Sequence, residues 1–182
     1  MAHRIGFFVF AALLLHASTI AAASEDDSCA SSAPALPAWV SVPEDLQPHV
    51  QSMLSASATF RAQCQRIAAA QSLVVLMRID PGLVDRSYRA QTWFGRTPAG
   101  VIVARVSISL RTSPVEWIAH EIEHVVEQVE GLRLATLAVQ RRGVWLSSDK
   151  TFETTRAIDA GRAVVAEMHR AGRRRRQDNI VE

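Results

Sequence analysis

The sequence predicts a small α+β domain with a short antiparallel or mixed sheet. Apolar residues recur at helical spacing over residues 46–70, and apolar and polar residues alternate over residues 101–110. A further helix has clear start signals at Ser113 and Pro114. The 182 residues, 48% of them hydrophobic, suffice for one domain with a core. The net charge of +2 gives no sign of a nucleic-acid binder, so we expect no nucleic-acid partner.

Residues 1–23 are typical of a signal peptide. Arg4 precedes an apolar run over residues 6–15, and the small residues 21–23 precede an acidic stretch. The alternative is an uncleaved membrane anchor, since the stretch to Ala23 is almost long enough to span a bilayer. We predict cleavage, export to the periplasm or the medium, and no transmembrane helix in the mature chain.

Export also bears on the two cysteines. In an oxidising compartment Cys29 and Cys64 form the available pair, so we predict a disulfide between them. The alternative is a buried thiol at Cys64, which lies on an apolar helical stripe, with Cys29 unpaired. Residues 24–43 are rich in Ser, Ala and Pro and are predicted to be a flexible linker before a domain over residues 44–171.

Four elements are expected in the first half of that domain. Helical spacing predicts one long helix over residues 46–70. A β-rich run over residues 73–79, ended by the turn residues Asp80-Pro81-Gly82, predicts a strand. Residues 83–100 are predicted to be a strand plus loops, and residues 101–110 to be another strand.

The second half begins with a well-marked helix. Ser113 is the predicted N-cap, Pro114 suits the first helical position, and Glu116 completes a capping box. Gly131 is a natural C-terminal stop. The core stripe of this helix is predicted to contain Ile118, Ile122, Val125 and Val129.

The remaining residues predict mainly helix. A short helix is expected over residues 132–140, followed by a loop that contains Trp145. The last helix is expected over residues 150–171, and residues 172–182 are expected to be a basic mobile tail. This tail is predicted to be solvated, with contact to anionic lipid or polymer as the alternative.

The sequence His120-Glu121-Ile122-Glu123-His124 carries the chemistry. Residues four apart lie on one face of a helix, so both imidazoles can bind a single metal ion. Glu121 is offset around the helix, where it can take a proton from a water activated by the metal and pass it to a leaving amine. In the alternative interpretation a solvated helix face opposite the apolar stripe is formed by Glu116, His120, Glu123, His124 and Glu127.

Glu153 is the predicted third ligand. It shares a helical stripe with Ala157, Ala160, Val164 and Met168. A carboxylate on an apolar face must be protonated, paired or bound to a cation. The alternative is a first-turn Glu with its head in solvent. Ala157, Ala160 and Gly161 are small enough to let another helix approach closely.

These residues resemble the gluzincin branch of the HExxH zinc metallopeptidases. The resemblance covers about residues 100–171 and implies a zincin-like fold, Zn²⁺ held by His120, His124 and Glu153, and Glu121 as the catalytic base. It also implies that the strand over residues 101–110 is an edge strand that pairs with an extended peptide. The residues expected to contact substrate are Ala104, Arg105, Val106 and Ser107.

The chain departs from the family at two positions. Metallopeptidases of this kind usually have an uncharged residue at the place of Glu123. The family often has an Asp four residues after the ligand Glu, where this chain has Ala157. From the motif and the resemblance we nevertheless expect a zinc-dependent peptidase acting on a peptide or protein. The alternative is an exported zinc-binding or protein-interaction module that has a zincin-like fold and no turnover; retention of Glu121 favours the enzyme.

Overall fold

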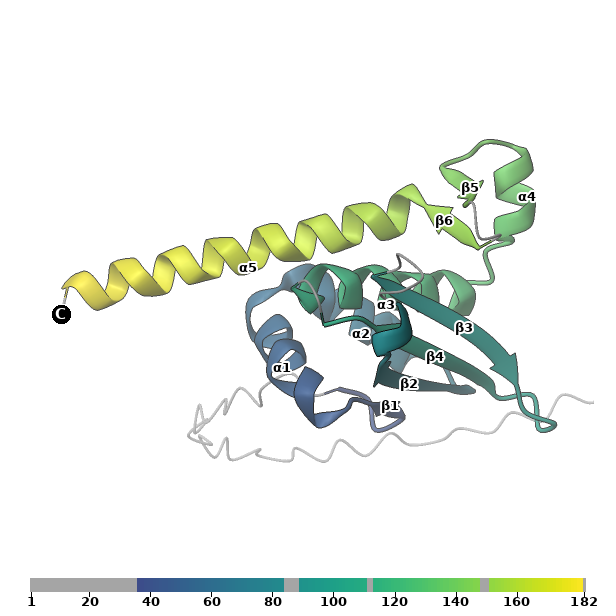
Figure 1. Cartoon of the computed structure of the whole chain (residues 1–182), viewed down its shortest axis with the longest axis horizontal. Helices are drawn as coiled ribbons and strands as arrows, with labels where there is room; N and C mark the ends of the chain where they lie inside the picture. The colour runs from purple at the N-terminus through teal and green to yellow at the C-terminus, as the bar shows by residue number, and fades with distance from the viewer. Residues whose placement is uncertain (1–35, 84–88, 111–112, 148–150, 182) are drawn as a thin grey trace, which may run out of the picture. The chain divides into compact units, whose positions relative to one another are not determined.

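A computed structural model of the chain describes residues 36–83, 89–110, 113–147 and 151–181. The predicted signal peptide, most of the predicted linker and Cys29 lie outside the described residues. The fold is α+β, as predicted (Figure 1). In the described part of the chain, every helix is too short or too polar to cross a membrane.

The main sheet is mixed and has the strand order β1-β2-β4-β3. Its strands are β1 (Val40–Ser41), β2 (Leu73–Ile79), β3 (Ala90–Arg96) and β4 (Ile102–Ile108). β1, β2 and β4 are parallel to one another, and β3 runs antiparallel to β4. In β2, buried Leu73, Val75 and Met77 alternate with exposed Leu76 and Arg78. One face of the sheet therefore packs on the core and the other faces outward.

β1 corrects the boundary of the predicted linker. Val40 pairs with Val75, so the sheet begins inside residues 24–43. Leu36 and Val42 also pack against the core cluster. The predicted linker therefore ends before Val40, because β1 pairs with β2 and the apolar residues around it pack against the core.

The single helix expected over residues 46–70 is two helices. A 3-10 turn, η1 (Glu44–Leu46), leads into α1 (Gln47–Ala56), and α2 (Ala58–Ala68) follows. The break is at Ser57, whose backbone is extended and whose hydroxyl accepts a hydrogen bond from the Phe60 amide at 3.0 Å. Ser57 is thus the N-cap of α2.

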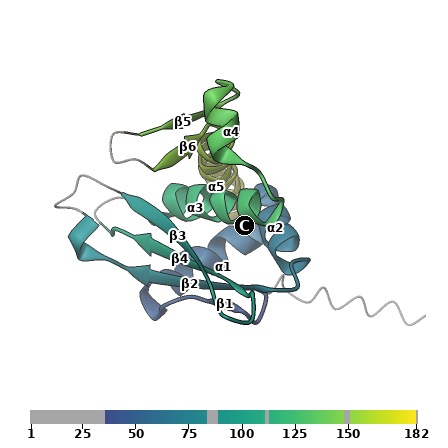
Figure 2. The same cartoon turned by 90° about the vertical axis from the view of Figure 1, so that its right-hand side faces the viewer.

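The predicted metal-binding helix is α3 (Pro114–Val129), which packs along α5 (Thr155–Val181) (Figure 2). Ser113 occupies the N-cap position without a side-chain capping bond, so the predicted capping box does not form. Gly131 adopts a φ of +71°, as expected for a helix stop. Gly161 permits the close approach of α5, because a Cβ there would lie 2.9 Å from the Glu116 carbonyl oxygen.

The core lies between the sheet and the helices. On α3 the predicted stripe is confirmed, with Ile118, Ile122 and Val125 buried and Val129 partly buried. Large, fully buried side chains from η1, α1, α2 and β4 join them: Leu46, Met53, Leu54, Phe60, Ile67 and Ile108. Cys64 is buried in this cluster, and burial raises the pKa of its thiol to about 12. Because Cys29 is not described, its pairing with Cys64 remains a prediction.

A smaller unit precedes α5. It consists of α4 (Leu134–Val139) and the antiparallel pair β5 (Val144–Leu146) and β6 (Phe152–Thr154). Trp145 was expected in a loop but lies in β5, and the last helix begins at Thr155 instead of residue 150.

The C-terminal boundary also differs from the prediction. The helix expected to end at residue 171 continues to Val181 and includes the predicted basic tail. Its arginines, Arg173 to Arg176, are exposed. A run of arginines is compatible with a helix, because Arg has a high helix propensity.

Candidate metal centre

The face of α3 that carries the HExxH sequence is buried. His120 is 5% exposed and His124 is 9% exposed, while Glu127 is 1% exposed. The alternative of a solvated face is therefore wrong. α3 packs against the sheet on one side and α5 on another, so its polar side must be satisfied inside the protein.

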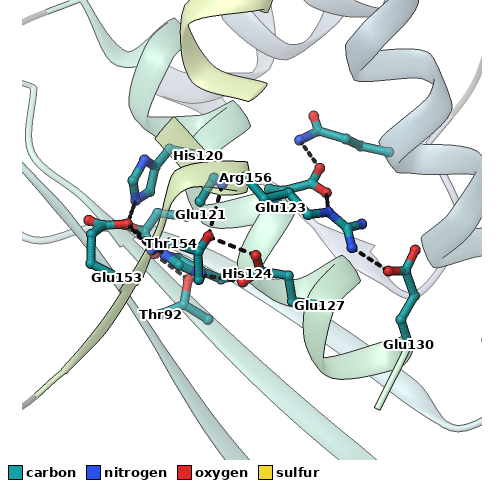
Figure 3. A network of polar contacts seen from close by, with 12 residues as sticks. Thr92, His120, Glu121, Glu123, His124, Glu127, Glu130, Glu153, Thr154 and Arg156 are labelled. Carbon is teal, nitrogen blue, oxygen red and sulfur yellow. Dashed lines mark hydrogen bonds and ion pairs between the residues drawn. The ribbon is translucent and has the colours of Figure 1, made fainter. Parts of the chain in front are cut away.

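His120, His124 and Glu153 converge (Figure 3). The Glu153 Oε1 atom lies 3.2 Å from His120 Nε2 and 3.6 Å from His124 Nε2. One ligand atom from each residue lies within 4.8 Å of the other two. Tetrahedral ligands at the zinc distance of roughly 2.0–2.2 Å lie about 3.4 Å apart. The cluster could therefore hold a metal ion.

Glu153 reaches the cluster from a strand. It belongs to β6, where it pairs with Trp145 of β5, and not to the helical stripe of Ala157 and Val164. The Thr154 backbone amide donates to Glu153 Oε1 at 2.8 Å. The prediction that Glu153 joins the two histidines is confirmed, but the helical reasoning behind it is wrong.

Contacts between acidic and basic groups in the cluster shift the pKa values of Glu153 and His124. Partial burial opposes ionisation of Glu153, but hydrogen bonds from His120 and His124 outweigh it and lower the pKa of this carboxyl below its usual range. Burial likewise disfavours the charged form of His124, but its contacts with Glu127 and Glu153 raise its pKa to about 10. Before it binds a metal, His124 is thus protonated at neutral pH.

Glu121 lies beside the cluster without joining the ligand set. Its Oε2 atom accepts a hydrogen bond of 2.7 Å from the hydroxyl of Thr92 on β3. Burial raises the pKa of Glu121, whereas His124, His120 and the Thr92 hydroxyl oppose this rise and nearby Glu153 adds to it. A carboxylate with a raised pKa binds a proton more readily, which suits a general base.

Glu127 is the residue that sequence reasoning undervalued. Its Oε2 atom lies 2.8 Å from His124 Nδ1, and its Oε1 atom accepts a hydrogen bond of 2.7 Å from the Thr154 hydroxyl. That hydroxyl oxygen also accepts from the Ala157 amide at 2.9 Å, which caps the start of α5. Glu127 therefore links the candidate ligand His124 to Thr154, the residue that follows the candidate ligand Glu153.

The only advance signal for Glu127 was its position. It lies three residues after His124, so the two side chains are neighbours on a helix. Carboxylate partners of this kind orient metal-binding histidines. Glu127 thus supplies a carboxylate contact to His124 from α3 itself.

Glu123 belongs to a separate ionic network. Its carboxylate accepts hydrogen bonds from Gln63 of α2 at 2.7 Å and from Arg156 of α5. Arg156 also contacts Glu130 (Figure 3). Arg66 lies 3.6 Å from Glu123. The charged residue at this place of the motif therefore joins three helices and points away from the metal ligands.

The expected substrate-binding strand is corrected by the sheet topology. β4 lies between β2 and β3, so Ala104, Arg105, Val106 and Ser107 belong to an interior strand that pairs on both sides. Ala104 and Val106 are buried in the core, while Arg105 is exposed. The strands at the two ends of the sheet are β1 and β3, and it is β3 that contacts Glu121. An added peptide strand cannot pair with β4.

No protein-family model matches the chain, and neither a curated protein nor a solved structure matches it.

Proposed function

We propose that this protein is a zinc-dependent peptidase. The observation that carries the proposal is the convergence of His120 and His124 with Glu153, beside the buried carboxylate of Glu121. Two imidazoles and one carboxylate are a ligand set typical of catalytic zinc, and three protein ligands leave a position for substrate or water. Zn²⁺ held there would polarise a peptide carbonyl and acidify a water molecule.

The chain's own groups supply the remaining steps. Glu121 accepts the proton of the attacking water and transfers it to the leaving amine. The Thr92 hydroxyl fixes the Glu121 carboxylate, and Glu127 holds the Nδ1 proton of His124 so that Nε2 is directed towards the ligand position. The substrate is a peptide or protein.

Metal binding is tested first. We expect about one zinc per chain in the purified protein, measured by elemental analysis. The double variant His120→Ala/His124→Ala should lose the metal. Unchanged zinc content in that variant would remove the proposal.

Turnover is tested with Glu121→Gln and Glu153→Gln on a broad peptide library. Glu121→Gln should keep zinc and lose activity by roughly a hundredfold or more, the scale of general-base loss. Glu153→Gln should lose activity together with zinc, because an amide is a poor zinc ligand. Equal cleavage by the wild type and Glu121→Gln would assign the activity elsewhere. A zinc-loaded wild type that cleaves nothing would favour a non-catalytic zinc-binding module.

A further inference from the structure

Two exposed aromatic residues are each a neighbour of a residue in the candidate metal centre. Phe94 lies on β3, two residues after Thr92, whose hydroxyl contacts Glu121. Trp145 lies on β5, directly opposite Glu153 of β6 in the antiparallel pair. The catalytic steps proposed above use neither aromatic side chain.

Trp145 lies on the same face of the β5–β6 pair as Glu153. Directly opposed residues of an antiparallel pair project to one face, with their Cβ atoms about 5 Å apart. That face is turned towards α3, because the Glu153 carboxylate contacts His120 and His124. Trp145 is nevertheless 42% exposed. It therefore stands beside the ligand cluster with a surface that another molecule can contact.

Phe94 projects from the same side of β3 as Thr92. Alternate residues of a strand share a face, and two residues span about 7 Å. Phe94 pairs with the buried Ala104, so this is the core-facing side of the sheet. Phe94 is nevertheless 38% exposed. It therefore presents apolar surface about 7 Å along β3 from the residue that holds Glu121.

The two aromatic residues approach the centre from different elements. In both views β3 and the β5–β6 pair lie on opposite sides of α3, which carries the two histidines (Figures 1 and 2). Successive Cα atoms of a peptide are about 3.8 Å apart. A peptide bound for hydrolysis at the cluster therefore has the side chains that flank its scissile bond within reach of Phe94 and Trp145. Large apolar side chains there would remove the exposed aromatic surface from water.

We propose that Phe94 and Trp145 are specificity-determining residues that select peptides with a large apolar side chain next to the scissile bond. This inference rests on the proposed function and names its substrate class. A single methylene group in an apolar subsite is sufficient for about tenfold discrimination between substrates. Contact with either ring can thus distinguish a leucine or phenylalanine side chain from that of alanine.

The chain offers an adjacent control for each of these residues. Trp93 precedes Phe94 on β3 and therefore projects from the outward face of the sheet. Leu146 follows Trp145 on β5 and therefore projects from the other face of the β5–β6 pair. Both control side chains are more exposed than the residues they control for. The four alanine variants thus separate the orientation of a side chain from its position in the sequence.

The first measurement is cleavage of a broad peptide library, with the cleaved bonds identified by mass spectrometry. In the wild type, large apolar residues should be enriched about tenfold over alanine beside the scissile bond. Phe94→Ala and Trp145→Ala should each lower this enrichment by about threefold or more, because each removes one of the two rings. Trp93→Ala and Leu146→Ala should keep it. The enrichment is a ratio within one preparation, so partial unfolding or loss of metal does not change it.

The second measurement is peptide binding by the Glu121→Gln protein, which is expected to lack turnover. The probes are two short fluorescently labelled peptides of alanine and serine. One has leucine and phenylalanine at its two central positions, and the other has alanine there. Fluorescence anisotropy should show about tenfold tighter binding of the apolar peptide. Adding Phe94→Ala or Trp145→Ala should reduce this difference, whereas adding either control substitution should not.

The two measurements distinguish failure of this inference from failure of the proposed function. Cleavage without an apolar preference, or a preference that both test variants keep, overturns the inference and leaves the peptidase. Equal losses in the test and control variants do the same. Preferential binding of the apolar peptide through Phe94 and Trp145, without any cleavage, supports these contacts and contradicts the peptidase. Equal affinity for both peptides, without any cleavage, contradicts both.

Discussion

At the residue scale, Glu127 determines how His124 is presented. Its two oxygens contact His124 Nδ1 and the Thr154 hydroxyl, and both contacts are buried. Glu127→Gln removes the charge that favours the Nδ1 proton, so we expect zinc affinity to fall by about 10–100-fold. A chelator competition titration measures this loss.

Glu116→Gln is the matched control for that variant. Glu116 lies on the same helix, α3, but takes no part in the hydrogen bonds given above for the cluster. The zinc affinity of the Glu116→Gln variant should stay at the wild-type value. A normal zinc affinity in Glu127→Gln would mean that packing alone orients His124.

Also at this scale, the spacing of the motif predicted part of the centre and could not predict the rest. His120, Glu121 and His124 are related by helix geometry, which is local and therefore visible in sequence. Thr92 and Thr154 reach the centre from β3 and from the end of β6, and only the tertiary fold brings them there. Glu153 was found from its charge on an apparent stripe, although the residue lies in a strand.

At the element scale, the contact between α3 and α5 depends on a missing side chain. A Cβ at Gly161 would lie 2.9 Å from the Glu116 carbonyl oxygen, so either helix would have to shift. Gly161→Ala should therefore destabilise the fold by about 1–3 kcal/mol despite the better helix propensity of alanine. Urea unfolding followed by circular dichroism measures the change.

Gly172→Ala on the same helix is the control. A Cβ there meets no atom within 4 Å, so only propensity changes. Gly172→Ala should stabilise the fold by at most about 0.5–1 kcal/mol, because Gly172 lies in the last part of α5. Equal effects of the two substitutions would contradict a close helix contact at Gly161.

A second contact between elements explains the break at Ser57. Glu167 of α5 accepts hydrogen bonds from the Ser57 hydroxyl, from the Thr59 hydroxyl at 2.9 Å and from the Thr59 amide at 3.1 Å. A carboxylate is thus held at the N-terminus of α2, where the helix dipole favours it. Sequence periodicity continued through Ser57 because the partner that ends α1 and starts α2 is distant in the chain.

Glu167→Gln should cost about 1 kcal/mol of stability at pH 7. Partial burial opposes the charge of Glu167, but its bonds from Ser57 and Thr59 outweigh this and lower its pKa. A lowered carboxyl pKa stabilises the fold above the ordinary value of about 4.3 and stops doing so as the pH falls through the native value. The difference between wild type and variant should therefore shrink in acid, as urea unfolding at several pH values would measure.

Asp159→Asn is the control for this charge effect, because Asp159 is exposed on the same helix. It should change stability by less than about 0.5 kcal/mol at either pH. A cost for Glu167→Gln that does not depend on pH would indicate lost packing instead of a lost charged cap.

For the main sheet, the sequence predicted the positions of two strands but not the order of the strands. A β-rich run ended by a turn located the strand of residues 73–79, and alternation of apolar and polar residues located the strand of residues 101–110. It carried no information on strand order, so the strand expected at the edge, β4, proved to be interior. Strand order depends on pairing between distant segments, such as Val75 with Ala104, which single-strand patterns do not encode.

At the scale of the whole molecule, the candidate ligands join two parts of the fold. His120 and His124 belong to α3 in the core, whereas Glu153 belongs to the β5–β6 pair. An ion bound by all three would restrict separation of these parts and would bind the folded state only. Metal loading should therefore raise global stability.

Zinc at a hundred times its dissociation constant should add about 2.7 kcal/mol to the free energy of unfolding. For a domain of this size that corresponds to a rise in melting temperature of about 5–10 °C. Differential scanning calorimetry with and without zinc measures the rise. Glu121→Gln should show the same gain, because Glu121 is not a ligand, and His120→Ala/His124→Ala should show none.

The gain from zinc should also increase with pH, and His124 explains the sign. Its pKa of about 10 in the metal-free protein lies above the ordinary value of 6.5, so its proton stabilises the metal-free fold fully below pH 6.5 and progressively less towards pH 10. Zinc must displace that proton, and the displacement becomes easier as the pH rises. Calorimetry between about pH 6 and pH 8 should show a growing difference between zinc-loaded and metal-free protein, accompanied by proton release on zinc binding. A difference that is constant over this range would mean that zinc does not displace the proton of His124, and hence that His124 does not bind the metal.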